Sequence, residues 1–122
     1  MKIASGIGID LVSVKRFEER LQDTAFLERL FTPEELTYAG EGSQRAARLA
    51  GCWAAKEAVA KALGCGFGAE LTWKDVEINH NQKGQPIVKL SQRAEQKHNN
   101  PRLMLSISHD GVYAIAIVIR LQ

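Results

Sequence analysis

The stretch SQRAARLAGCWAAKEAVAKALG, residues 43–64, decides the fold. It is rich in alanine, which has the highest helix propensity of the amino acids and a side chain small enough to let neighbouring elements pack closely. Ser43 is suited to begin a helix, and Gly64 is suited to end one. The stretch therefore predicts one long helix over residues 43–64, against which the rest of the chain packs.

The chain before this helix predicts one strand and two short helices. Isoleucines and glycines interleave over residues 2–10, a strand in which glycine marks the close approach of another backbone or a ligand. A helix is expected from a cap at Ser13 to about residue 22. TPEE at residues 32–35 has the cap, the proline and the glutamate of a capping box, so another helix begins there and ends at the glycines of residues 40 and 42.

The chain after the long helix predicts strands over residues 71–79, 86–90, 103–107 and 112–121, and a short helix over 91–98. A turn at residues 81–84 joins the first two strands, and Asp110-Gly111 is typical of a hairpin between the last two. Strands at both ends with helices between them predict an α+β fold, in which an antiparallel sheet carries the long helix and the shorter helices on one side. We expect a single domain over residues 1–122.

The composition limits the function. Of the 122 residues, 45% are hydrophobic and 25% are charged, as in an average globular domain. The net charge of +2 gives no support to nucleic-acid binding, and the longest apolar run, residues 112–119, is too short to span a membrane. Cys52 and Cys65 lack the spacing of a metal site. Since no signal peptide is recognisable, we expect reduced thiols in a cytoplasmic protein.

The long helix carries an acidic residue on its predicted buried side. Leu49, Trp53, Glu57 and Lys61 recur every four residues, so they lie along one stripe with alanines around it. A carboxylate in such surroundings needs a partner, a metal ion or a proton. The spacing alone leaves two interpretations open: Glu57 pairs with Lys61 one turn later, or it belongs to a functional site.

Asp10 ends the first strand and precedes a helix. It is either an ordinary aspartate at a strand end or a second carboxylate directed at the site of Glu57. Two converging carboxylates form a natural Mg²⁺ site, because this ion binds one or two carboxylates and keeps water and phosphate oxygens in its remaining positions. His109, where a strand turns, and the glycine-rich loop at residues 64–68 are weaker signals, which an ordinary polar turn and a helix end would also explain.

Four segments, spread from one end of the chain to the other, form a recognisable set. They are GIGID at residues 6–10, FTPEEL at 31–36, WAAKEAVAK at 53–61 and SISH at 106–109. In this order and spacing they resemble the bacterial holo-acyl-carrier-protein synthases, the small single-domain 4′-phosphopantetheinyl transferases. The third segment is similar to the central signature of that family and is the most specific of the four.

The resemblance implies transfer of the 4′-phosphopantetheine group of coenzyme A to a serine of apo acyl carrier protein, with release of adenosine 3′,5′-bisphosphate. It implies that Asp10 and Glu57 bind Mg²⁺, that Lys61 is a second cation for the phosphates, and that Glu57 or a metal-bound water molecule takes the serine proton. It also implies a homotrimer with sites between subunits, where His109 lines the coenzyme A site of a neighbour.

One departure from the family concerns the coenzyme A phosphates. Many members have a basic residue just before the central aromatic residue, where this chain has Cys52. Arg45 or Arg48, earlier on the same helix, would replace that contact. The resemblance adds Gly66 of the glycine-rich loop to the coenzyme A site. Lys56 is a further basic residue considered for phosphate, although it lies off the acidic stripe.

The first helix offers a candidate docking surface. Lys15, Arg16 and Arg20 would attract acyl carrier protein, which is strongly acidic, while Glu18 and Glu19 weaken the surface and leave an ordinary solvated helix face open. Two other functions also stay open. One is a binding module for coenzyme A or an acidic partner without catalysis, and the other is a small RNA-binding domain, for which the sequence shows no basic stripe. We expect neither nucleic acid nor a membrane as partner.

Overall fold

A computed structural model describes residues 3–122. In chain order its elements are β1 (Ala4–Ser13), α1 (Val14–Glu18), α2 (Thr24–Leu30), α3 (Pro33–Ala39), α4 (Arg45–Leu63), the 3₁₀ turn η1 (Trp73–Asp75), β2 (Val76–His80), β3 (Pro86–Leu90), α5 (Gln92–Lys97), β4 (Arg102–His109) and β5 (Tyr113–Leu121). None of the described helices is long and apolar enough to cross a membrane.

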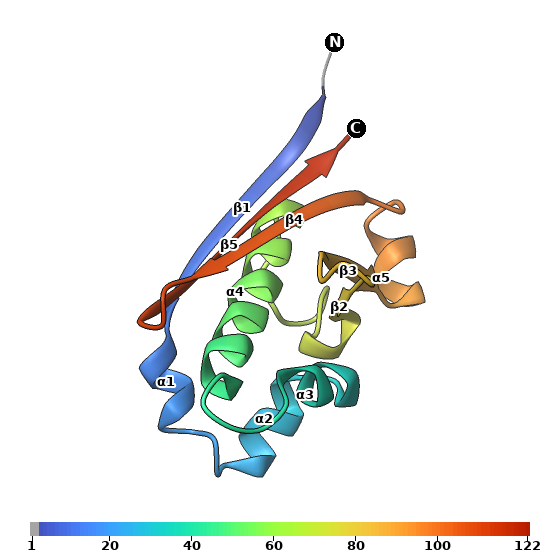
Figure 1. Cartoon of the computed structure of the whole chain (residues 1–122). Helices are drawn as coiled ribbons and strands as arrows, with labels where there is room; N and C mark the ends of the chain where they lie inside the picture. Colours follow the sequence, from blue (N-terminus) through green and yellow to red (C-terminus); the bar gives the residue numbers. More distant parts are fainter. Residues whose placement is uncertain (1–2) are drawn as a thin grey trace.

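The three longest strands form an antiparallel sheet in the order β1-β5-β4, and α4 lies along one face of it (Figure 1). Helices α1, α2 and α3 gather around the beginning of α4, and α5 lies beside β3. This arrangement confirms the predicted α+β fold. The prediction of one antiparallel sheet did not distinguish β2 and β3 from the other strands, although they form a two-stranded sheet of their own.

Helix α4 packs unusually close to β1 because two glycines face it. A Cβ atom added to Gly8 would overlap the backbone carbonyl of Ala58, and one added to Gly6 would overlap that of Ala62. The expected close approach of another backbone to this strand is therefore confirmed. It brings the next residue of the same face, Asp10, toward α4.

The predicted elements are mostly present, but some boundaries differ. β1 continues to Ser13, whose side chain makes no capping hydrogen bond. Helix α1 begins at Val14 as expected but ends at Glu18, because the chain turns over residues 19–22 before α2, so it has five residues where a longer helix was expected. The strand predicted from residue 71 begins at Val76, because Asp75 accepts hydrogen bonds from Thr72 and folds residues 73–75 into a 3₁₀ turn. Helix α2 was not predicted. Lys2, which the expected first strand included, lies outside the described residues.

Most of the predicted signals for helix ends are confirmed, but the expected start at Ser43 is wrong, because α4 begins at Arg45 and its N-cap residue is Gln44. Thr32 and Glu35 form a reciprocal capping box at α3, Ser91 caps α5, and Gly64 ends α4 in the left-handed conformation with φ of 78°. These features are local, since each depends on a side chain and a backbone group within a few residues.

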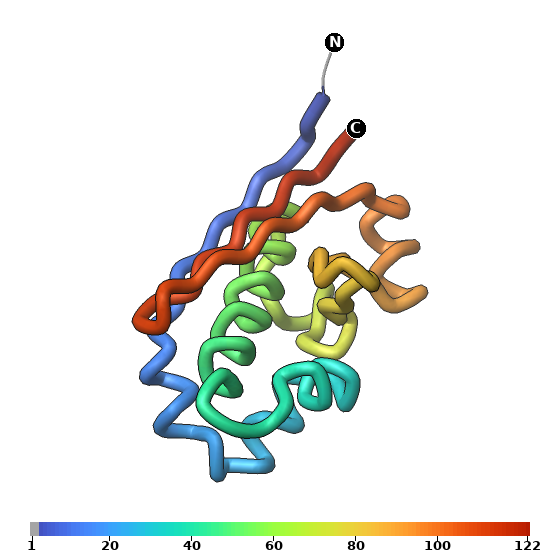
Figure 2. Tube along the Cα trace, in the orientation of Figure 1, coloured from blue at the N-terminus to red at the C-terminus, as the bar shows by residue number. Residues whose placement is uncertain are grey.

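Strand β5 is the centre of the large sheet. It pairs with β1 from Tyr113 to Leu121, so Ala4 and Leu121 are neighbours at one end of the sheet (Figure 2). The face of the sheet turned away from α4 is apolar and exposed, with large side chains from all three strands: Ile7, Ile9, Leu11, Met104, Tyr113, Ile115 and Ile117. A contiguous exposed apolar surface of this kind marks an interaction site.

Candidate functional site

Asp10 faces helix α4 from the sheet. It shares the inner face of β1 with Gly6 and Gly8, because side chains alternate between the two faces of a strand. Lys61, in the last turn of α4, reaches across: its Nζ donates a 2.8 Å hydrogen bond to the carbonyl of Ile9 and lies 3.4 Å from Oδ1 of Asp10. The Asp10 side chain is 19% exposed and that of Lys61 is 51% exposed. A ligand can therefore still reach both groups.

Glu57 lies one turn before Lys61 on α4 and completes the group. Burial raises the pKa of its carboxyl, and the carboxylate of Asp10 raises that pKa further, whereas the charges of Lys61 and Arg16 lower it. Among residues 3–122, Lys61 forms its ion pair with Asp10 and not with Glu57, so the simple helical pair is not what the structure contains. We call Asp10, Glu57 and Lys61 the carboxylate site.

The carboxylate site suits a hydrated divalent cation. A cation held between the two carboxylates would offset the charge of Asp10, which raises the pKa of Glu57, and Mg²⁺ takes one or two carboxylates. Within the part of the chain that the structure describes, no group of three or more His, Cys, Asp or Glu side chains is arranged to hold a metal ion. The site therefore fits Mg²⁺ better than Zn²⁺, which needs more ligands from the protein.

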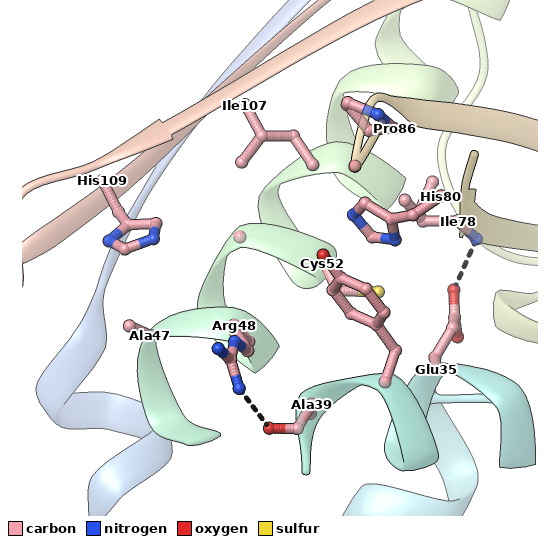
Figure 3. A pocket seen from close by; sticks show the side chains of 13 residues that line it. Glu35, Ala39, Ala47, Arg48, Cys52, Ile78, His80, Pro86, Ile107 and His109 are labelled. Carbon is pink, nitrogen blue, oxygen red and sulfur yellow. Dashed lines mark hydrogen bonds between the residues drawn. The ribbon is translucent and has the colours of Figure 1, made fainter. Parts of the chain in front are cut away.

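A second site lies on the other flank of α4. A cavity of about 240 Å³ opens between α3, α4, β2 and β4, and Arg48 and His109 both line it (Figure 3). Its wall is partly apolar, with Ile107 and Pro86 among the lining residues. Cys52 also lines it, and burial raises the pKa of this thiol well above its usual value, so Cys52 contributes no charge. We call this cavity the α3–α4 pocket.

Two lining residues of the pocket were missed by sequence reasoning. Tyr38 of α3 and His80 of β2 stack face to face, with ring centroids 3.7 Å apart and planes within 5°. Nδ1 of His80 is buried without a hydrogen-bond partner among residues 3–122, and burial lowers the pKa of this imidazole. No local pattern could have found the pair, because the two residues come from different elements.

The carboxylate site and the α3–α4 pocket are separated by α4. Asp10 pairs with Ala116 of β5, which pairs with Ile107 of β4 on the far edge of the sheet. Two strand spacings of ~4.8 Å put the Cα atoms of Asp10 and Ile107 about 10 Å apart, with α4 packed over the space between them. One chain therefore holds His109 and Arg48 on one flank of α4 and its two carboxylates on the other.

The remaining basic residues of α4 have structural partners. Lys56 is completely buried: its Nζ lies 2.7 Å from Oε1 of Glu35 and donates hydrogen bonds to the carbonyls of Leu30 and Trp73. The suggestion that it contacts phosphate is therefore wrong for this fold. Arg45 donates to carbonyls at the end of α3, which leaves Arg48 as the one of the two candidates that faces the pocket.

The other predicted residues lie at the surface. Gly66 is exposed in the loop after α4, beyond the end that carries Lys61, and it does not line the α3–α4 pocket. On α1, Lys15 is exposed and Arg16 packs over the ring of Trp53. Arg20, in the turn after α1, forms a 2.9 Å ion pair with Asp23. The three basic residues thus have three different environments.

The sequence matches the 4′-phosphopantetheinyl transferase superfamily over residues 6–118. The chain belongs to this superfamily. It is similar to the holo-acyl-carrier-protein synthase of Wolinella succinogenes, with 43% identity over 114 residues, which are 92% of this chain and 93% of that one. The family resemblance that the four sequence segments suggested is therefore confirmed.

Solved members of the superfamily have the same fold. The holo-acyl-carrier-protein synthase of Helicobacter pylori in complex with coenzyme A superposes with a TM-score of 0.86 at 38% identity, covering 93% of this chain and 98% of that chain. That of Bacillus anthracis in complex with CoA (3′,5′-ADP) gives 0.84 at 36% identity, covering 98% and 97%. Both structures show that relatives of this fold bind coenzyme A.

Proposed function

We propose that this protein is a holo-acyl-carrier-protein synthase, which transfers 4′-phosphopantetheine from coenzyme A to a serine of apo acyl carrier protein. The observation that carries the proposal is the meeting of Asp10, Glu57 and Lys61 at one place in a chain of this superfamily. A module that only binds coenzyme A would have no need for the carboxylate of Asp10 beside that of Glu57, whose pKa it raises. The proposal assigns one transferase domain to residues 1–122, and its free cysteines fit a cytoplasmic protein.

The reaction is a phosphoryl transfer, so the protein mainly has to position groups and neutralise charge. The serine oxygen forms a bond to the phosphorus that carries the pantetheine. The bond from that phosphorus to adenosine 3′,5′-bisphosphate breaks, and the serine proton passes to Glu57 or to a water molecule. Asp10 and Glu57 would hold Mg²⁺, which supplies positive charge to the pyrophosphate, and Lys61 adds a second cation.

The nucleotide end of coenzyme A is assigned to the α3–α4 pocket. Arg48 and His109 supply groups for a phosphate, and the apolar wall suits a flat base. Arg48 takes the place of the basic residue that Cys52 replaces, because it lies one turn earlier on the same side of α4. Gly66, beyond the Lys61 end of the helix, is assigned to the pantetheine side.

We infer that the working form is a homotrimer with sites between subunits. The two halves of the site lie on opposite flanks of α4 in one chain, so a coenzyme A molecule would join the pocket of one subunit to the carboxylate site of the next. The exposed apolar face of the large sheet gives copies of the chain a surface to bury. Light scattering at the mass of one chain would contradict this assembly.

Complementation tests the shared site directly. Glu57→Gln and His109→Ala are each expected to be nearly inactive alone, but co-expressed chains combine a working carboxylate site with a working His109 in about one quarter of the sites of a random trimer. Recovery of activity supports a site between subunits. No recovery, with mixed trimers verified by native mass spectrometry, would place each complete site within one chain.

The basic face of α1 is assigned to acyl carrier protein. Lys15 and Arg16 lie on α1, which follows β1 directly, and Arg20 lies in the turn after this helix. The three residues are five to ten positions after Asp10, hence near the place where the serine must arrive. Their charges would increase the rate of encounter with an acidic partner more than its affinity. High salt is expected to raise KM for the carrier protein and to leave kcat nearly unchanged.

The release of adenosine 3′,5′-bisphosphate tests the proposed function. Glu57→Gln keeps the size of the side chain and removes its charge, and we expect turnover to fall roughly hundredfold or more, as for loss of a group that stabilises transition-state charge. Glu28→Gln is the matched control, because Glu28 is exposed on α2, away from both sites. Full activity in Glu57→Gln would refute the assignment of the carboxylate site.

A further inference from the structure

Both tryptophans of the chain belong to one stack of rings. Phe67 of the glycine-rich loop stacks on Trp73, with centroids 3.8 Å apart and planes at 15°, and Trp73 stacks on Trp53 of α4 at 4.5 Å and 28°. The guanidinium of Arg16 packs over Trp53, with Cζ 4.5 Å from the ring centroid. We call Phe67, Trp73 and Trp53 the aromatic stack. It connects the loop after α4 to helix α1.

Arg16 of α1 differs from Arg20, which lies in the turn after this helix. Arg20 has an ion pair with Asp23 and lies 3.8 Å over the ring of Phe26, so its position is already explained. Arg16 has no such partner: among residues 3–122, no carboxylate or carbonyl accepts a hydrogen bond from its N–H groups. It is nevertheless held in place through its flat face by Trp53.

The position of Arg16 is next to the carboxylate site. Trp53 lies one turn before Glu57 on the same stripe of α4, and the charge of Arg16 reaches the Glu57 carboxyl. A guanidinium that stacks through its face keeps its edge available, and that edge matches two oxygens of a phosphate at once. The stack therefore presents a phosphate-binding group that is already oriented.

The charges at the carboxylate site explain why a further cation is useful there. Asp10 and Glu57 are both acidic. Lys61 is the one cation of the carboxylate site, and it already donates hydrogen bonds to Asp10 and to the carbonyl of Ile9. A pyrophosphate arriving there is repelled by the carboxylates. Arg16 supplies an additional positive charge that no carboxylate of the described chain neutralises by an ion pair.

We propose that Arg16 is a phosphate-binding residue of the transfer site, held by Trp53 to meet the pyrophosphate of coenzyme A. The aromatic stack is then the positioning element, because it fixes Trp53 from the side of the glycine-rich loop. This inference rests on the proposed function and gives Arg16 a role beyond the docking of the carrier protein.

Coenzyme A binding tests this role apart from catalysis. Isothermal titration with coenzyme A in the presence of Mg²⁺ is expected to show affinity about ten- to hundredfold weaker for Arg16→Met than for the unchanged protein, the range for loss of a hydrogen bond to a charged group. Arg16→Lys keeps the charge but not the two-pronged edge and should recover part of the affinity. Lys15→Met is the matched control on the same helix: it should raise KM for the carrier protein without weakening coenzyme A binding.

Tryptophan fluorescence reports the stack itself. Since both tryptophans are in the stack, coenzyme A should change the emission of the unchanged protein, and this change should be smaller in Arg16→Met and in Phe67→Leu. Circular dichroism verifies that each variant is folded. If folded Arg16→Met and Arg16→Lys bind coenzyme A like the unchanged protein and only raise KM for the carrier protein, the inference is wrong.

The two proposals fail in different ways. A protein that binds coenzyme A but modifies no carrier protein refutes the proposed function, while the titrations still decide the role of Arg16. A protein that transfers phosphopantetheine but whose Arg16→Met variant binds coenzyme A unchanged refutes only the further inference.

Discussion

Two lysines of α4, five residues apart, should respond in opposite ways to the same substitution. Lys56 is fully buried against Glu35 at 2.7 Å, and Lys61 is half exposed and 3.4 Å from Asp10. Replacing Lys56 by methionine leaves the carboxylate of Glu35 buried without its cation, and breaking a buried pair in this way costs about 3–5 kcal/mol. Glu35 still accepts hydrogen bonds from the backbone of Thr32 and Ile78, which favours the lower part of that range.

The replacement of Lys61 should have little effect on stability, because partly exposed ion pairs contribute only about 0–1 kcal/mol. The replacement should instead reduce turnover, because it removes the cation for the phosphates. We therefore expect Lys56→Met to unfold easily but to retain turnover per folded molecule, and Lys61→Met to remain stable and lose most of its turnover.

Urea unfolding followed by circular dichroism measures the first effect. With a slope of about 1.5 kcal/mol per M, a loss of 3–5 kcal/mol moves the midpoint down by about 2–3 M. Removing both charges in Glu35→Gln/Lys56→Met should recover part of the loss, since no charge is then left unpaired. The reasoning is refuted if Lys56→Met unfolds within about 1 kcal/mol of the unchanged protein, or if it stays folded and loses coenzyme A affinity.

Two further comparisons test the close packing of α4 and the effect of Glu57 on stability. Gly8→Ala puts a Cβ atom against the carbonyl of Ala58, so it should lower the free energy of unfolding by about 1–3 kcal/mol and reduce turnover. Gly68→Ala is the control, because it has open space around it and should change neither quantity. Equal stability of the two variants would contradict the packing described. Folding raises the pKa of Glu57 above its ordinary value of 4.5. The protonated Glu57 therefore stabilises the folded protein below pH 4.5, and this stabilisation is lost as the pH rises through the pKa of the folded state. Near neutral pH, Glu57→Gln should therefore unfold at a higher urea concentration than the unchanged protein, whereas in acid it should not. A variant that is less stable at neutral pH would show that the charge of Glu57 does not destabilise the fold.

The parts of the fold set by local chemistry were predictable from the sequence. The capping box at Thr32, the helix end at Gly64 and the strand Pro86–Leu90 all agree with the structure. Alanine content predicted α4, and the glycines of the first strand predicted a close backbone neighbour. Each of these signals acts within one element or through the absence of a side chain.

The parts that depend on distant partners were not predictable. Lys56 belongs to a motif with two lysines, and only its place on the inner side of α4 shows that it binds Glu35 and not phosphate. The stack of Tyr38 on His80 joins residues more than forty positions apart in sequence. The spacing of residues along the sequence does not predict such contacts between distant elements.

The candidate site was half predictable. Helical spacing put Glu57 and Lys61 on one stripe, and the end of a strand marked Asp10, so the carboxylate site follows from sequence once the strand is known to face the helix. The separation of this site from Arg48 and His109 could not be predicted from the sequence, because it depends on the strand order β1-β5-β4. That separation is also the reason to expect a site built from two copies of the chain.

The mass of an apo acyl carrier protein after incubation with this protein, coenzyme A and Mg²⁺ tests the central claim most directly. We predict that electrospray mass spectrometry shows the addition of one phosphopantetheine group, that the addition is on a serine, and that it disappears with a chelator or with Glu57→Gln. An unchanged carrier mass after incubation with folded protein that binds coenzyme A would contradict the claim that Asp10, Glu57 and Lys61 form a transfer site.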